Sequence, residues 1–167
     1  MVTRRLVLIA GGAAFTAWFA PGRLAVAAST GTSPVTHTDA EWRQLLTPAQ
    51  YAVLRQNATE RPFSSPLLGE HRPGIFACAG CDRGLFSSET KFNSGTGWPS
   101  FWAPLNDDAI GTTKDTSLGM ARTAMHCAGC DGHLGHVFND GPPVTGLRYC
   151  MNGIAMKFKP AIAQQGG

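Results

Sequence analysis

Cys78-Ala79-Gly80-Cys81 and Cys127-Ala128-Gly129-Cys130 are near copies of each other, and they decide how this chain folds. A two-residue spacer lets one turn direct both sulfurs of a pair at a single ion. Two such pairs supply the four thiolates of a closed tetrahedral zinc site. We therefore expect one structural zinc per chain, joining two distant segments. The glycine before each second cysteine predicts a left-handed turn there.

The fifth cysteine, Cys150, lies in the segment Arg148-Tyr149-Cys150-Met151-Asn152. If this segment is extended, its side chains alternate between two faces. Tyr149 and Met151 then face a core, while Arg148, Cys150 and Asn152 share the other face. A guanidinium beside a thiol favours the thiolate. Cys150 is therefore the candidate nucleophile.

Other uses of the five cysteines stay open at this point. An exported protein could form two disulfides and keep one free thiol. A disulfide within a Cys-x-x-Cys pair closes a very small loop and constrains little, but disulfides between the pairs are compatible with the spacing. A redox-active dithiol of the thioredoxin type would need a strand, helix and strand context, which the sequence does not provide.

The N-terminus has the features of an export signal. Arg4 and Arg5 precede an apolar run over residues 6–20, and Ala25-Val26-Ala27 has the form of a cleavage site. The paired arginines predict a twin-arginine signal peptide over residues 1–27; an ordinary secretory signal is the alternative. We expect a periplasmic or otherwise exported protein that meets the membrane only during export.

The net charge depends on that signal. Cleavage would remove Arg4, Arg5 and Arg23 from the 14 basic residues, leaving 11 against 11 acidic residues. No basic stripe then remains for nucleic acid. We expect a monomer that binds no nucleic acid.

The 167 residues suffice for one ordinary domain. We expect a flexible linker over residues 28–38, the domain over 39–160 and a tail over 161–167. Thr38 and Thr47 have the pattern of helix N-caps, so two short helices should open the domain. Beyond Arg61, short apolar alternations are broken by Gly, Pro, Asn and Asp, which predicts a mainly β fold.

The last predicted strand runs from Leu147 to Phe158 and contains an irregularity. Its apolar positions are odd up to Met151 and even from Ile154 onward. A β-bulge at Gly153 would produce this change, and bulges often lie beside active sites. The alternative is that the strand ends there.

Two histidines follow the second cysteine pair in His133-Leu134-Gly135-His136. Imidazole has an ordinary pKa of about 6.5 and can donate a proton near neutrality, so both are candidate acids. The alternative is that they are hydrogen-bonded core residues. Asp140 is placed to orient an imidazole or Arg148, or it simply belongs to an Asp-Gly turn. His126 is not needed as a zinc ligand.

A glycine-rich loop is followed by three aromatic residues, Trp98, Phe101 and Trp102. Trp98, between Gly97 and Pro99, is expected to line a surface pocket, where its ring can contact a small apolar group of a ligand. Phe101 is a second candidate for substrate contact, although packing is the commoner use of an aromatic residue in a small β domain.

These residues resemble the B-type peptide-methionine sulfoxide reductases over about residues 39–160. The matching segments include Arg61-Pro62-Phe63-Ser64-Ser65-Pro66-Leu67-Leu68, Phe86-Ser87-Ser88-Glu89-Thr90-Lys91-Phe92, Gly97-Trp98-Pro99-Ser100-Phe101, His133-Leu134-Gly135-His136-Val137-Phe138 and Arg148-Tyr149-Cys150-Met151-Asn152. The resemblance implies two antiparallel sheets, a four-cysteine zinc site and reduction of the R epimer of methionine sulfoxide in proteins or peptides, which repairs oxidative damage.

The resemblance also assigns roles to individual residues. It implies that Cys150 is the nucleophile and that His133 and His136 bind or protonate the sulfoxide oxygen. Asn152 would form a hydrogen bond to the substrate, and Trp98 would contact the methyl group on its sulfur. Attack by a thiolate on a sulfoxide leaves a cysteine sulfenic acid, the first and reversible oxidation state of the thiol.

The chain departs from the family at two positions. Many members have a second, resolving cysteine where this chain has Thr96, and the sequence contains no sixth cysteine. We therefore expect a thioredoxin-like protein or a small thiol to reduce the sulfenic acid. Gly153 stands where the family usually has serine.

A non-catalytic zinc-knuckle binding module is the rival function, but such a module has no need of a lone thiol beside two histidines.

Overall fold

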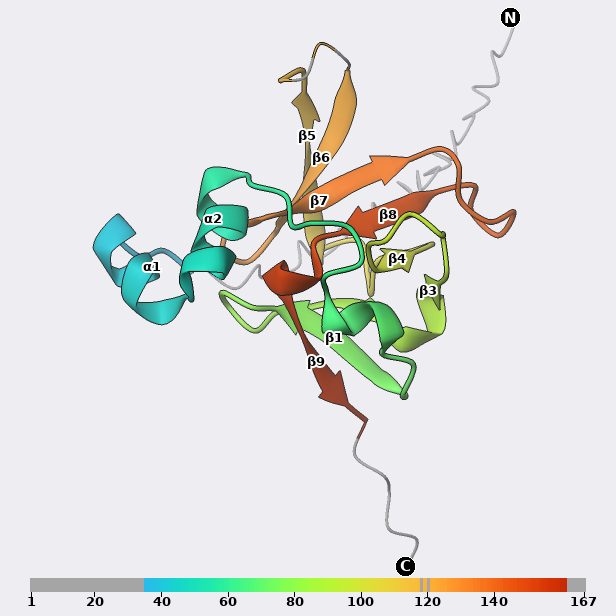
Figure 1. Cartoon of the computed structure of the whole chain (residues 1–167), viewed down its shortest axis with the longest axis horizontal. Coiled ribbons are helices and arrows are strands. Elements are labelled where there is room, and N and C mark those ends of the chain that lie inside the picture. Colours follow the sequence, from blue (N-terminus) through green and yellow to red (C-terminus); the bar gives the residue numbers. More distant parts are fainter. Residues whose placement is uncertain (1–34, 118, 120, 162–167) are drawn as a thin grey trace, which may run out of the picture. The chain divides into compact units, whose positions relative to one another are not determined.

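A computed structural model describes residues 35–117, 119 and 121–161 (Figure 1). The predicted signal peptide over 1–27 lies outside these residues, as do most of the linker and of the tail. Among the described residues, no helix is both long and apolar enough to cross a bilayer. The helical elements are α1 (Asp39–Leu45), α2 (Pro48–Gln56) and the 3-10 turns η1 (Pro66–Gly69), η2 (Ser88–Thr90) and η3 (Gly153–Ala155).

The strands form two antiparallel sheets, which confirms the predicted fold class. One sheet has three strands in the order β2-β1-β9, and the other has six in the order β3-β4-β8-β7-β6-β5. Their bounds are β1 Gly74–Cys78, β2 Gly84–Ser87, β3 Lys91–Phe92, β4 Ser100–Phe101, β5 Ile110–Asp115, β6 Arg122–Cys127, β7 His133–Phe138, β8 Arg148–Met151 and β9 Met156–Pro160.

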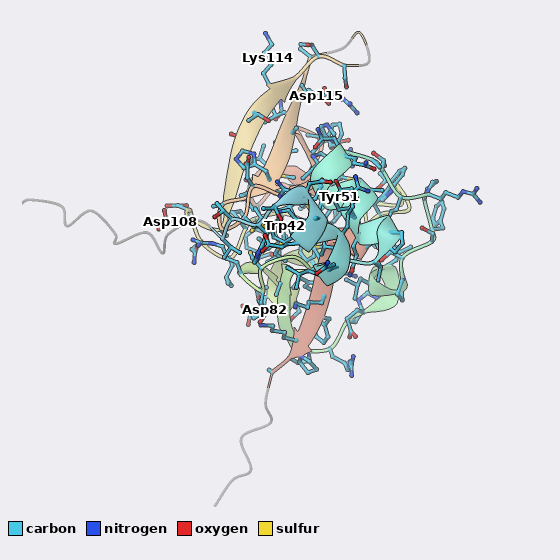
Figure 2. All side chains as sticks on the ribbon, turned by 90° about the vertical axis from the view of Figure 1, so that its left-hand side faces the viewer. Trp42, Tyr51, Asp82, Asp108, Lys114 and Asp115 are labelled. Carbon is cyan, nitrogen blue, oxygen red and sulfur yellow. The ribbon has the colours of Figure 1, made fainter. Side chains whose placement is uncertain are left out.

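The two helices begin as their sequences predict. Thr38 and Thr47 each accept a hydrogen bond from the backbone three residues on, and the Glu41 and Gln50 side chains accept one from the cap in return. These capping boxes satisfy backbone N–H groups that a short helix leaves unpaired. The helices bury Trp42 and Tyr51, which Figure 2 shows close together on the helical side.

Stacked phenylalanines fill the core. Phe101 is fully buried, with its ring centroid 4.4 Å from that of Phe86 and 5.0 Å from that of Phe76. Each such ring contributes roughly 1.5–3 kcal/mol when it is removed from water. The assignment of Phe101 to substrate contact was wrong, because its ring has no exposed face.

The predicted bulge at Gly153 was also wrong. β8 ends at Met151, the chain turns through η3, and β9 then joins the other sheet beside β1 (Figure 1). The N–H groups of Gly153 and Ile154 donate to the Glu60 carboxylate, at 2.5 and 3.0 Å, and not to a neighbouring strand. The change of apolar parity therefore marks a change of sheet.

Candidate active site

The four paired cysteines converge into a cluster whose sulfur atoms all lie within 4.8 Å of one another. Sγ of Cys78 is 3.7 Å from that of Cys130, and Sγ of Cys81 is 3.4 Å from that of Cys127. Four Zn–S bonds of about 2.3 Å in tetrahedral geometry place the sulfurs roughly 3.8 Å apart. The cluster therefore fits zinc. A disulfide would need about 2.05 Å, and all five cysteines are free.

The two knuckles adopt the same backbone form, although not the one predicted from their glycines. The left-handed residues are Asp82 and Asp131, which follow the second cysteine of each pair, with φ of 67° and 58°. Aspartate tolerates this conformation. Gly80 and Gly129 instead donate their N–H groups to the first sulfur of each pair, both at 3.4 Å. His126 lies outside the cluster, with its Nε2 3.5 Å from Asp131.

A row of residues crosses the six-stranded sheet on one face. Cys150 on β8 is opposite Ser100 on β4 and opposite His136 on β7. His136 is in turn opposite Ala124 on β6, which is opposite Thr113 on β5. Directly opposed residues in antiparallel strands have side chains on the same face. The thiol and the imidazole are therefore cross-strand neighbours.

His133 reaches the same face because β7 is irregular. Strand alternation would put residues 133 and 136 on opposite faces, but the register skips Leu134 between the Met125–Gly135 and His126–His133 pairs. The two imidazole rings lie 5.4 Å apart as a result. Gly135 is required at this point, since a Cβ there would lie 2.1 Å from the carbonyl oxygen of Cys150.

The two histidines differ in their surroundings. His133 is buried, and its burial, followed by the nearby charge of His136, lowers its pKa to about 4. His133 is therefore neutral near pH 7. His136 is partly exposed, and its Nε2 lies 2.8 Å from Oδ2 of Asp115.

Arg148 and Asp140 form a two-point ion pair, with Nε–Oδ1 and Nη2–Oδ2 distances of 2.8 Å. The Arg148 side chain is only 9% exposed and also lies over the ring of Phe138. Paired bonds of this kind fix the plane of a guanidinium. Asp140 therefore orients Arg148, one of the two arrangements that the sequence allowed.

Cys150 is half-buried, and that burial raises the pKa of its thiol. Hydroxyl groups of Thr96 and Ser100 and the charge of Arg148 act in the opposite direction. Thr96 Oγ1 is 3.9 Å from Sγ of Cys150 and 2.8 Å from Ser94 Oγ, which is 2.7 Å from Ser100 Oγ. Burial outweighs the thiolate-stabilising contacts.

No motif marks Glu60, which connects three parts of the site. Its carboxylate holds η3, its N–H donates to Oδ1 of Asn152 at 3.0 Å, and its carbonyl accepts from Nε1 of Trp98 at 3.1 Å. Asn152 also donates from Nδ2 to the Leu134 carbonyl at 3.1 Å. Within the described residues, this is the one hydrogen bond that Nδ2 of Asn152 donates. Trp98 is half-buried, and its indole N–H donates to the Glu60 carbonyl.

A cavity of about 760 Å³ lies beside the two histidines. Its polar lining includes Asn57, Thr59, Asp115, Arg122, His126, Asp131, His133 and His136. Another cavity, of about 580 Å³, lies against β1, β2 and β9 and has no imidazole pair, and Cys150 lines neither cavity. A site that uses the imidazoles of His133 and His136 therefore lies at the first of these cavities.

Comparison with known proteins gives one consistent result. The family described as SelR domain matches residues 46–160. Three curated proteins, each named "Peptide methionine sulfoxide reductase MsrB", are similar to this chain. The one from Agrobacterium fabrum is 53% identical over 130 residues, covering 77% of this chain and 96% of that protein. The one from Pseudomonas putida (strain W619) is 58% identical over 120 residues, covering 72% and 90%. The one from Thioalkalivibrio sulfidiphilus is 54% identical over 124 residues, covering 74% and 90%.

Proposed function

Because this chain belongs to the B-type peptide methionine sulfoxide reductases, we propose that it reduces the R epimer of methionine sulfoxide in proteins or peptides, with Cys150 as the nucleophile. The observation that carries this proposal is the direct opposition of Cys150 and His136 on one face of the six-stranded sheet. A thiol and a proton-carrying imidazole are the two groups that sulfoxide reduction needs.

The proposed step balances in atoms and electrons. The Cys150 sulfur attacks the sulfoxide sulfur, the oxygen passes to the Cys150 sulfur as the sulfur–oxygen bond of the substrate breaks, and the transient sulfur–sulfur bond then breaks to release methionine. The proton of the thiol ends on that oxygen, so the products are methionine and a cysteine sulfenic acid. Cys150 loses two electrons and the substrate sulfur gains them. His136 carries the proton, and neutral His133 donates a hydrogen bond to the oxygen.

The remaining site residues position these groups. Arg148, held by Asp140, stabilises the Cys150 thiolate by its charge. Asn152 offers its free N–H to the substrate. The face of Trp98 contacts the methyl group on the substrate sulfur, which gives a preference for one epimer.

Zinc, held by Cys78, Cys81, Cys127 and Cys130, stabilises the fold by joining the two sheets. Four thiolates leave the ion no open position, so its role is structural and each chain holds one ion. The chemistry at Cys150 proceeds on β8 of the six-stranded sheet, through this chain's own side chains.

Regeneration requires an external thiol. Thr96, close to Cys150, cannot form a disulfide, and the sequence has no sixth cysteine. Two equivalents of thiol convert the sulfenic acid to the free thiol, water and a disulfide of the reductant. A thioredoxin-like protein or a small thiol supplies them. We propose that the mature protein lies outside the cytoplasm, because paired arginines precede an apolar run at its N-terminus. We also propose that it is a monomer.

Single-turnover reactions with each epimer test the function without the natural reductant. The reduced enzyme should yield close to one methionine per chain from the R epimer, and the Cys150→Ser variant should yield none. Zinc content and circular dichroism should match in the two proteins. Product from the S epimer only would contradict the assignment, and inactivity of a folded, zinc-loaded enzyme toward both epimers would favour a binding module.

A further inference from the structure

His136 has a partner on the side away from Cys150. Its Nε2 lies 2.8 Å from Oδ2 of Asp115, the last residue of β5. Asp115 is opposite Arg122, the first residue of β6, and Arg122 Nη2 donates to the same oxygen at 2.6 Å. Figure 2 shows Asp115 and its neighbour Lys114 on opposite sides of the β5–β6 hairpin. Asp115, Arg122 and His136 therefore form one connected group across three strands.

The carboxylate of Asp115 only accepts hydrogen bonds. Its Oδ1 accepts from the Ser117 N–H at 2.9 Å, while Arg122 and His136 share Oδ2. The bonds from Ser117, then that from His136 and the charge of Arg122, hold the pKa of this carboxyl well below its usual range. An ionised carboxylate has no proton to donate. Nε2 of His136 must therefore be the donor.

This geometry fixes the tautomer of His136. A neutral imidazole has one N–H and one lone pair, and the bond at one nitrogen decides which nitrogen holds the proton. With the proton of neutral His136 on Nε2, the lone pair is on Nδ1. Among the hydrogen bonds of residues 35–117, 119 and 121–161, the contact with Asp115 is the only one made by the His136 ring. Nδ1 remains available for chemistry.

We propose that Asp115 is a positioning residue of the reductase: it fixes His136 with its proton on Nε2, so that Nδ1 takes the proton of the Cys150 thiol and returns it to the sulfoxide oxygen. The inference rests on the proposed function. One nitrogen suffices for the transfer, because the proton lost by the thiol is the one that the sulfenic acid gains. Asp115 also stabilises the imidazolium formed between the two steps, and Arg122 holds Asp115 in place.

The groups that face His136 are consistent with this role. His133 lies on its own strand with a ring centroid 5.4 Å away, and Cys150 is opposite on β8. Ala124, opposite on β6, brings no charge. Asp115 is therefore the carboxylate that contacts the ring, and Arg122 is the cation that partly balances it.

The test reads the tautomer directly. Zinc-loaded protein labelled with ¹⁵N in its histidine rings is studied by long-range ¹H–¹⁵N correlation at neutral pH, in the absence of substrate. The wild type should show the His136 proton on Nε2. Asp115→Ala should shift the proton toward Nδ1, whereas Lys114→Ala, a change at the exposed neighbour on the same hairpin, should leave it on Nε2. A lone pair on Nε2 in the wild type, or an unchanged tautomer in Asp115→Ala, would overturn the proposal.

Kinetics provide the second readout. Asp115→Ala should lower kcat about tenfold or more with little change in KM, and Asp115→Glu should restore part of the rate. Equal kcat in Asp115→Ala and wild type would also overturn the proposal. Because the tautomer is measured without turnover, its failure is distinguishable from failure of the proposed function, which would appear as a wild type inactive toward the R sulfoxide.

Discussion

The hydroxyl of Thr96 lies 3.9 Å from the sulfur of Cys150, at the end of a chain of hydroxyl groups that continues through Ser94 to Ser100. It occupies the position at which the resemblance to this family implies a resolving cysteine in many members. The contact lowers the pKa of the Cys150 thiol, although burial still raises that pKa overall. We therefore expect Thr96 to contribute to the reactivity of Cys150 and not to its resolution.

Thr96→Val should make Cys150 less reactive near neutral pH. Loss of the hydroxyl removes a contact that lowers the thiol pKa, so less thiolate is present at a given pH, and the deficit disappears at higher pH. A hydrogen bond worth about 1 kcal/mol corresponds to roughly a fivefold lower rate. The pH dependence of alkylation of Cys150 by iodoacetamide measures this. Thr96→Ser, which keeps the hydroxyl, is the control; equal pH profiles for Thr96→Val and wild type would refute the role.

Glu60→Gln should weaken both stability and substrate binding. The amide keeps the size of the side chain but replaces one acceptor of the η3 N–H groups with a donor, at an expected loss of about 1–3 kcal/mol. The backbone of Glu60 contacts Asn152 and Trp98, so a shift of residue 60 after loss of its side-chain contacts to η3 should also raise KM. Urea unfolding and steady-state kinetics measure the two effects. The exposed Glu89→Gln should change neither, and wild-type values for Glu60→Gln would show that the contacts are dispensable.

His133 should make stability depend on pH. Its pKa is about 4 in the folded protein, whereas an unfolded chain has about 6.5. Between these values the unfolded state binds the extra proton, so stability falls as pH decreases from about 6.5 to 4, by about 3 kcal/mol at most. Unfolding by urea at several pH values should show this slope in the wild type and a smaller one in His133→Asn. Parallel slopes would mean that the His133 ring titrates normally.

Loss of one cysteine of the cluster should destabilise the whole domain. Cys81→Ser would leave three thiolates for the proposed zinc, whose ligands Cys78 and Cys127 lie on β1 and β6, and loss of a structural metal typically removes about 4 kcal/mol or more. Cys150→Ser, which leaves the cluster intact, should retain one zinc per chain and wild-type stability. Elemental analysis and thermal unfolding distinguish the two variants. A stable, metal-free Cys81→Ser protein would argue against a structural zinc.

The local signals in the sequence predicted much of this architecture. Thr38 and Thr47 predicted the helix starts, and the cysteine spacing predicted the cluster, because each depends on residues a few positions apart. Turn chemistry was predicted less well. Asp82 and Asp131, not the neighbouring glycines, take the left-handed conformation, since the glycine N–H groups are directed at the sulfurs.

Long-range pairing explains what the sequence could not predict. Nothing near Leu134 indicates that β7 skips a residue there, because the irregularity exists only relative to β6. Glu60 and Asp115 likewise have no local motif. Their importance comes from partners on other elements, namely η3 for Glu60 and His136 for Asp115. The parity change at Gly153 was visible, but its cause, a change of sheet, depends on how β9 pairs with β1.

Trapping the oxidised cysteine tests the central claim most directly. Reduced enzyme is mixed with one equivalent of methionine-R-sulfoxide, without any other thiol, and then with a reagent specific for sulfenic acids. Peptide mass spectrometry should find the adduct on Cys150, in an amount equal to the methionine released, with the four cluster cysteines unmodified. Methionine release with an unmodified Cys150, or with the label on a cluster cysteine, would contradict the account.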